Sequence, residues 1–531
     1  MSTMDLTFEG SFAESRDKTL FNDQMIQHLF ELHEEFESSR QDLLKQREET
    51  QLNYDKGGYP HYLLNHPAKH ENWQVAAIPE DCRVRRVEIT GPVSSAKMVI
   101  NMLNPNQEGI AADMAMLDFE DSMKPTWENV LSGLHNVVGA IQGDLTFEQV
   151  SSNGSVKKYA LNPKGPRAHV MVRVRGLHMV ESHAHVKNSP ISAGVFDAYM
   201  VAALTAKIQL SRGETPMFYI PKMEHFKEAA WWNSLFAAIE RKLNLSSSSL
   251  RVTALIETLP ASYQVEEMLY ELRERALGFN GGRWDKIFSD IKTLRMHENR
   301  IMADRSYIDM TRSWMDNYAK NIIKICHKHG AYALGGMSAF TPGKDEATRI
   351  EQIKKVEADK AREAQIGHDG CWVSHPFFIK MARDQFKEEN QLHRLLENFL
   401  DQPDLLPQSD GPKTIEGLRK NIRVGIAYQK GWNEGLGCVA FDNMMEDLAT
   451  LEISRAQTWQ WLHFKVTLDD GTQVTKELVK KIFAEECEKI ISEFNGQEKD
   501  QWIEAKTMAE ETFLMDRLNN FFGDIQQRKA Q

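Results

Sequence analysis

Long apolar runs, cysteines and excess basic charge are all scarce in this 531-residue sequence. No run approaches the ~18 consecutive apolar residues that a membrane-spanning helix needs, so we expect no membrane partner. The five cysteines are scattered and form no Cys-x-x-Cys pair, which argues against a disulfide framework or a zinc knuckle and favours reduced thiols. Acidic residues outnumber basic ones by 76 to 64, and the formal net charge of -12 makes nucleic acid a poor partner.

Neither end of the sequence carries a targeting signal that we recognise. The first residues lack the basic and apolar stretches of a secretory signal. The final Arg528-Lys529-Ala530-Gln531 differs from the peroxisomal Ser-Lys-Leu signal. Together with the reduced cysteines, these observations predict a cytoplasmic protein, and they leave the oligomeric state unknown.

Apolar residues make up 41% of the chain, and its length suggests a large core with accessory domains. The helical pattern of residues 22–51 ends at Gly57-Gly58, so residues 1–80 are predicted to form a helical N-terminal region. Residues 386–531 are predicted to form a helical C-terminal domain, because apolar residues recur at helical spacing in segments 414–429, 444–464, 476–494 and 499–522.

Between these regions, residues 81–385 alternate short β-branched runs with longer helical patterns. The runs are 86–90, 114–120, 170–175, 217–222, 252–257, 276–280, 332–337 and 372–375. Eight successive β and α units predict an α/β fold, the (β/α)₈ TIM barrel. A doubly wound open sheet is the structural alternative.

Charged residues stand near the carboxyl ends of several predicted strands. Because side chains alternate faces along a strand, Arg173 and Arg175 should both point into the barrel. By the same rule Asp118 and Glu120 share one face, and Glu257 ends its strand opposite the apolar face. The carboxyl ends of barrel strands form the catalytic rim. The alternative is that the two arginines only pair with Asp118 and Glu120.

These charges leave an acidic surplus. With the nearby Asp285 there are four carboxylates against two guanidiniums, a local charge of -2. A bound divalent cation would neutralise it, and carboxylate oxygens with room for water suit Mg²⁺. Zinc is disfavoured because no cysteine or histidine lies close to these carboxylates in the sequence.

The stretch 278–288, GFNGGRWDKIF, resembles the signature of the malate synthase family. Further matching segments follow the family's order at 86–92, 118–122, 173–178, 256–261 and 445–450, and the length is that of the shorter, A-type enzymes. Three positions depart from the family pattern: Phe279 replaces Leu, Lys286 replaces Tyr and Arg275 stands where His is usual. We expect Lys286 to face solvent.

The resemblance implies a barrel with an N-terminal helical clasp and a C-terminal helical plug. It implies a transferase of the glyoxylate cycle, which feeds the tricarboxylic acid cycle: acetyl-CoA, glyoxylate and water give malate and CoA, with Mg²⁺ as cofactor. The residues that it implies are Arg173 and Asp447 for catalysis, Glu257 and Asp285 as metal ligands, Gly282, Arg283 and Trp284 for substrate binding, and Asp118 and Glu120 to orient metal-bound waters.

Alternatives remain open at this point. Asp447 alone could be an ordinary helix-start carboxylate; a helix N-terminus would lower its pKa, and the flanking apolar residues would raise it. A related acyl-CoA lyase, of the malyl-CoA or citrate lyase type, could share the arginine and the metal carboxylates. The Met-Glu-Asp segment in the helical C-terminal domain favours the synthase. A non-catalytic barrel scaffold would have no need of Arg173, Glu257, Asp285 and Asp447 together.

Overall fold

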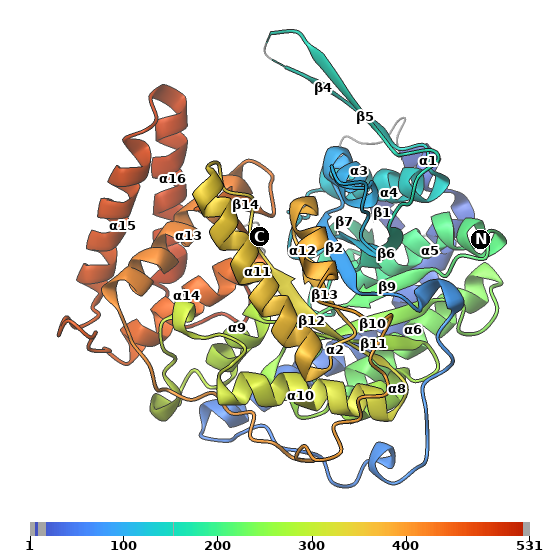
Figure 1. The fold of residues 1–531 in the computed structure, drawn as a ribbon, viewed down its shortest axis with the longest axis horizontal. Coiled ribbons are helices and arrows are strands. Elements are labelled where there is room, and N and C mark those ends of the chain that lie inside the picture. Colours follow the sequence, from blue (N-terminus) through green and yellow to red (C-terminus); the bar gives the residue numbers. More distant parts are fainter. Residues whose placement is uncertain (1–5, 9–16, 152, 524–531) are drawn as a thin grey trace.

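The computed structural model describes residues 6–8, 17–151 and 153–523. Figure 1 shows a strand barrel wrapped by helices, with the C-terminal helices gathered in a lobe beside it and a long hairpin projecting away from the body. Among the described residues, no helix is both long enough and apolar enough to cross a membrane.

Eight parallel strands close into a barrel in chain order. They are β2 (Val87–Pro92), β3 (Met114–Asp118), β6 (His169–Arg173), β9 (Met217–Ile220), β10 (Arg251–Ile256), β11 (Ala276–Gly281), β12 (Tyr332–Ser338) and β13 (Gly370–Val373). The predicted strands are confirmed. The pairing of Cys371 with Val87 joins the last strand to the first, which excludes the open-sheet alternative.

Helices follow the strands and cover the outside of the barrel. The α-helices are α3 (Ala96–Leu103), α4 (Trp127–Gln142), α5 (Ala193–Ser211), α6 (Phe226–Leu243), α7 (Leu259–Ser262), α8 (Val265–Leu272), α9 (Trp284–Thr293), α10 (Ser313–Lys328), α11 (Glu346–Ile366) and α12 (Ile379–Arg383). Short 3₁₀ turns lie at η1 (Pro67–Lys69), η2 (Glu80–Cys82), η3 (Glu298–Arg300), η4 (Arg305–Tyr307) and η5 (Pro376–Phe378).

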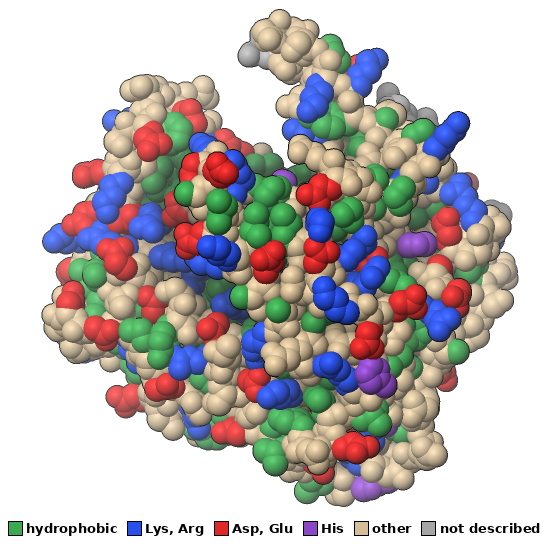
Figure 2. All heavy atoms as spheres, in the orientation of Figure 1, with side chains coloured by type: hydrophobic (Ala, Val, Ile, Leu, Met, Phe, Trp, Pro, Cys, Tyr) green, Lys and Arg blue, Asp and Glu red, His purple; other side chains and the backbone are tan. Residues whose placement is uncertain are grey.

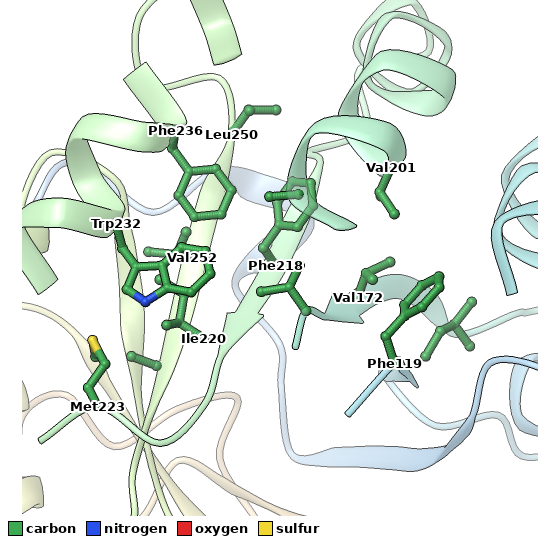
Figure 3. Packing of buried hydrophobic residues seen from close by; sticks show 14 of the residues in the cluster. Phe119, Val172, Val201, Phe218, Ile220, Met223, Trp232, Phe236, Leu250 and Val252 are labelled. Carbon is green, nitrogen blue, oxygen red and sulfur yellow. The ribbon is translucent and has the colours of Figure 1, made fainter. Parts of the chain in front are cut away.

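Alternation along the strands sorts the core into two layers. Outward-facing Val172, Phe218 and Val252 pack under the helices, and Figure 3 shows Trp232 and Phe236 of α6 in this layer. The barrel centre is filled by a separate apolar cluster, Met114, Met116, Met171, Met217, Leu255, Leu277 and Leu334 among them. The predicted division of the strand 170–175 into an apolar outer face and an inner face is therefore confirmed for its first residues.

The N-terminal region is dominated by one long helix. After α1 (Asp17–Leu20), Asn22 caps α2 (Asp23–Asp55), and the chain leaves the helix near Gly57, whose φ is 98°. Arg47 on the buried face of α2 donates hydrogen bonds to Glu228 of α6 at 2.6 Å. Strand β1 (Leu6–Phe8) pairs with β7 (Val180–Val186), which pairs with β8 (Ser189–Ser192).

The C-terminal lobe contains α13 (Ile415–Asn433), α14 (Leu448–His463), α15 (Lys476–Ile491) and α16 (Gly496–Phe513). The prediction that a helix begins at 444 is wrong, because Met444–Glu446 forms strand β15, which pairs with β14 (Val439–Phe441). The hairpin of β4 (Thr146–Val150) and β5 (Val156–Ala160) was not expected from the sequence. Strand β5 carries Lys157 and Lys158, and Figure 2 shows basic side chains along this arm.

Candidate active site

The carboxyl ends of the strands meet around one pocket. Asp118 and Arg173 are the last residues of neighbouring strands β3 and β6, and they are register partners. Glu257 directly follows β10, and Asp285 lies in the first turn of α9, which follows β11. The predicted site residues lining this pocket are Asp118, Arg173, Glu257, Gly282, Arg283, Trp284, Asp285 and Asp447.

Arg173 is held by a two-pronged ion pair with Asp118. Its Nε and Nη2 donate to the two carboxylate oxygens at 2.7 and 2.6 Å, and Nη1 lies 3.3 Å from Asp121 and 3.4 Å from Glu120. Burial alone would lower the pKa of Arg173, but the three carboxylates raise it. Arg173 is therefore a permanent, oriented positive charge at the rim.

Asp118 has no capacity left for a further role. Besides Arg173, its oxygens accept the backbone N–H groups of Glu120 and Ser122 at 2.9 Å and the Ser122 hydroxyl at 2.5 Å. Burial raises the pKa of Asp118, but Arg173 and Ser122 lower it below the ordinary value. Asp118 stays ionised, and it orients the guanidinium.

Lys222 and Asp121 complete the cluster, and sequence reasoning missed both. The Lys222 ammonium lies 2.7 Å from both oxygens of Asp121, 2.9 Å from Glu120 and 3.2 Å from Asp285. Its backbone N–H donates to Glu257 at 2.8 Å. The sequence did contain a signal for Lys222, because it stands at the end of the predicted strand 217–222, just as Arg173 and Glu257 stand near the ends of theirs. Asp121 was missed because β3 ends at Asp118, and the alternation of side chains between the two faces of the strand stops there.

The site holds a large acidic surplus. Six carboxylates (Asp118, Glu120, Asp121, Glu257, Asp285 and Asp447) face two cations, Arg173 and Lys222. Burial and the neighbouring Asp285 raise the pKa of Glu257 to about 8. Burial also raises the pKa of Asp285 and, well above its ordinary value, that of Glu120. Ionised together, these groups require a further positive charge.

The residues present fit a hard divalent cation. Both side-chain oxygens of Glu120 and one of Asp285 are buried without a well-formed hydrogen bond. A Cβ at Gly282 would lie 2.9 Å from the Glu257 Cβ, so only glycine leaves that carboxylate its space. Within the described residues no three His, Cys, Asp or Glu side chains are arranged to hold a metal. Mg²⁺ keeps several waters and needs only one or two carboxylates.

Asp447 reaches the pocket from the C-terminal lobe. The backbone N–H of Met445 donates to the backbone carbonyl of Ala339 at 2.8 Å, and that of Leu448 donates to the backbone carbonyl of Asp121 at 3.2 Å. These two hydrogen bonds attach the segment to the barrel rim. Asp447 is the N-cap of α14, not a residue of its first turn, and it forms a capping box with Thr450. Burial, Asp121 and Asp285 raise the pKa of Asp447 well above its ordinary value, so burial outweighs the helix N-terminus.

Two predicted orientations are wrong. Arg175 lies past the end of β6 and turns away from the site to pair with Asp197 and Glu181, both at 2.7 Å. Lys286 is fully buried and not solvent-facing, because its ammonium forms an ion pair with Asp290 on the inner face of α9. The predicted pairing of Arg173 with Asp118 and Glu120 is present.

Successive segments of this chain match known protein families. Three family profiles match in chain order: the malate synthase N-terminal domain over residues 13–65, the malate synthase TIM barrel domain over residues 169–405 and the malate synthase C-terminal domain over residues 412–527. The chain belongs to the malate synthase family. Membership confirms the family, the fold class and the malate synthase activity that the sequence predicts.

Curated malate synthases align over most of this chain. The malate synthase of Myxococcus xanthus (strain DK1622) is 43% identical over 88% of this chain and 86% of its own. Malate synthase A of Escherichia coli (strain K12) is 38% identical over 98% of this chain and 97% of its own. The glyoxysomal malate synthase of Cucumis sativus is 37% identical over 96% of this chain and 91% of its own.

Proposed function

We propose that this malate synthase condenses acetyl-CoA with glyoxylate and then hydrolyses the thioester, giving malate and CoA. The observation that supports this reaction is the meeting of a raised-pKa carboxylate, Asp447, with a fixed guanidinium, Arg173, in one buried pocket. The reaction needs a base for the acetyl methyl group and positive charge for the enolate that forms.

Asp447 is the proposed base. Its raised pKa makes the ionised carboxylate a stronger base than a solvent-exposed aspartate. The methyl proton passes to a side-chain oxygen of Asp447, and Arg173 stabilises the charge that develops on the thioester oxygen. Because Asp118 already fixes the orientation of Arg173, the guanidinium needs no rearrangement when the enolate forms.

Glu257 and Asp285 are the proposed ligands of Mg²⁺. When bound, Mg²⁺ would supply Lewis-acid polarisation of the glyoxylate carbonyl. Glu120, whose oxygens form ion pairs with Lys222 and Arg173 but no well-formed hydrogen bond, keeps its expected role toward metal-bound water. We propose that Asp118 orients the Arg173 guanidinium and not a metal-bound water.

The start of α9 is the proposed seat of the glyoxylate carboxylate. The first N–H groups of a helix have no partner within the helix, and they attract anions. Gly282 donates its own N–H to Ile256 at 3.3 Å, so we assign binding to Arg283 and Trp284 and to Gly282 only the absence of a side chain.

A second cavity is the proposed channel for acetyl-CoA. It adjoins the first pocket through the shared residues Thr90, Met98, Ser374 and Met445. Its apolar lining, which includes Met102, Phe377 and Met381, suits the pantetheine arm. The thioester would then arrive beside Asp447, two residues from Met445.

An assay of thiol release from acetyl-CoA tests the proposal. We expect release that requires both glyoxylate and Mg²⁺ and yields free malate. Cleavage of malyl-CoA without net malate synthesis would indicate a lyase instead, and binding without turnover would indicate a scaffold.

We propose that the protein works in the cytoplasm, because its five cysteines are all free in the structure and a reducing compartment keeps thiols free. The Cucumis sativus relative is named glyoxysomal, so peroxisomal import is the other outcome of a localisation experiment with a tagged full chain.

A further inference from the structure

Lys222 takes a backbone conformation that needs explaining. It follows Pro221 just after β9 with a φ of 50°, the left-handed region that L-residues with a side chain rarely adopt. Such a conformation persists only where the surroundings hold it in place. The ammonium and its stem are almost completely buried, with 3% of the side chain exposed.

Three independent contacts hold this residue. Its carbonyl accepts a hydrogen bond from Arg47 of α2 at 2.9 Å, and Glu228 fixes that guanidinium. Its N–H donates to Glu257 at 2.8 Å. Its ammonium lies among the carboxylates of Asp121, Glu120 and Asp285. One residue thus connects the N-terminal helix to both proposed metal ligands.

Its contacts divide into two functions. The backbone amide orients the Glu257 carboxylate whatever the side chain at 222 is. The side chain supplies one positive charge to a cluster whose other cation, Arg173, is already paired with Asp118. The ammonium touches Asp285 at 3.2 Å, the longest of its contacts, and Asp121 at 2.7 Å.

We propose that Lys222 is a positioning residue that acts as a built-in counter-ion, keeping the acidic cluster assembled before the divalent cation and substrate enter. The proposal rests on the proposed function of the site. Lys222 remains anchored on Asp121 and Glu120, and Asp285 is the carboxylate that it shares with the incoming cation. Its charge therefore stabilises the metal-free protein and weakens the attraction for the metal.

Lys222→Met tests this division, because methionine keeps the unbranched shape, most of the length and the backbone N–H but removes the charge. Thermal unfolding in EDTA and calorimetric titration with Mg²⁺ alone are the measurements, and neither requires turnover. We expect a lower Tm without metal and a Kd for Mg²⁺ that is at least about tenfold tighter, because a unit positive charge a few ångströms away repels the cation even when partly screened. Weaker Mg²⁺ binding, or an unchanged Tm, would overturn the proposal.

The double variant Lys222→Met with Asp121→Asn guards against simple misfolding. It removes one charge of each sign, so the metal-free Tm should recover most of its loss and the Kd for Mg²⁺ should return toward the wild-type value. A double variant no more stable than Lys222→Met would show that the lysine serves only packing.

Glu257→Gln separates this proposal from the metal assignment. It should weaken Mg²⁺ binding without lowering the metal-free Tm, since the neutral amide keeps the acceptor for the Lys222 N–H and adds no negative charge to the cluster. If Glu257→Gln binds Mg²⁺ normally, the ligand assignment fails, and the recovery of Tm in the double variant still reports on Lys222.

Discussion

Asp447 combines two tasks, because its carboxylate caps α14 and also faces the pocket. The capping contact to the Thr450 N–H is 3.3 Å long, and burial together with Asp121 and Asp285 dominates the pKa of the group. The ordinary helix-start interpretation and the catalytic one are thus both compatible with the same geometry, and variants must separate them.

Asp447→Asn separates the two tasks, because asparagine caps a helix as well as aspartate but cannot take up a proton as a base. We expect kcat to fall by about 10²–10⁴-fold with Tm near or above the wild-type value. Asp447→Ala is the matched control; it should lose the same activity and also about 1 kcal/mol of stability with the cap. Steady-state kinetics and thermal unfolding measure both. Near-normal turnover of Asp447→Asn would exclude Asp447 from the mechanism.

At the scale of elements, helix starts show how a cap depends on protonation. His225 caps α6 through its Nδ1, which accepts the Lys227 N–H at 3.2 Å and must therefore be unprotonated. Burial, and then Lys227 and His66, lower the pKa of His225 to about 4. The unfolded chain binds the proton near pH 6.5, so this contribution to stability is complete above pH 6.5 and is lost as the pH falls toward 4.

His225→Asn keeps a capping acceptor and removes the titration. We expect the wild-type Tm to fall more steeply than the Tm of the variant between pH 6.5 and pH 4, with little difference in slope above pH 7. Thermal unfolding over that range, with the variant and wild type in the same buffers, measures it. Parallel curves would mean that His225 does not couple capping to pH.

On the scale of the whole molecule, the N-terminal helix α2 is attached to the outside of the barrel through Arg47. Arg47 and Glu228 form a buried ion pair at 2.6 Å, and the same guanidinium supports the carbonyl of Lys222. A helix distant in sequence thus supports the loop whose Lys222 contacts the pocket residues Asp121 and Asp285. The limits 1–80, 81–385 and 386–531 stay a prediction for the three domains.

Arg47→Met should destabilise the protein by about 3–5 kcal/mol, since it leaves the Glu228 carboxylate buried without its partner. Adding Glu228→Gln should restore part of that loss, because the neutral amide can still accept the Glu224 N–H. Thermal unfolding of the single and double variants gives the comparison. A single variant as stable as the wild type would show that the clasp does not depend on this pair.

Local patterns were enough to locate the barrel strands and much of the site, whereas the closure of the sheet needed the pairing of the last strand with the first. The period-two alternation of the strands, the strand-end charges and the signature around Asp285 are all properties of neighbouring residues, and they placed Asp118, Arg173 and Glu257 at one rim. Prediction failed where the regular strand stopped. Arg175 follows the end of β6, so alternation no longer set its direction, and Asp197 and Glu181 drew it elsewhere.

The sequence by itself determined the positions of the strands, the family and the residues able to carry the chemistry, because these follow from periodicity and short motifs. Only the tertiary structure decided which charges meet. Lys222 among the carboxylates, Lys286 in the interior and the raised pKa of Asp447 depend on burial and on partners distant along the chain. Electrostatic energy depends on distance through space and on removal from water, and neither quantity is encoded in the spacing of residues.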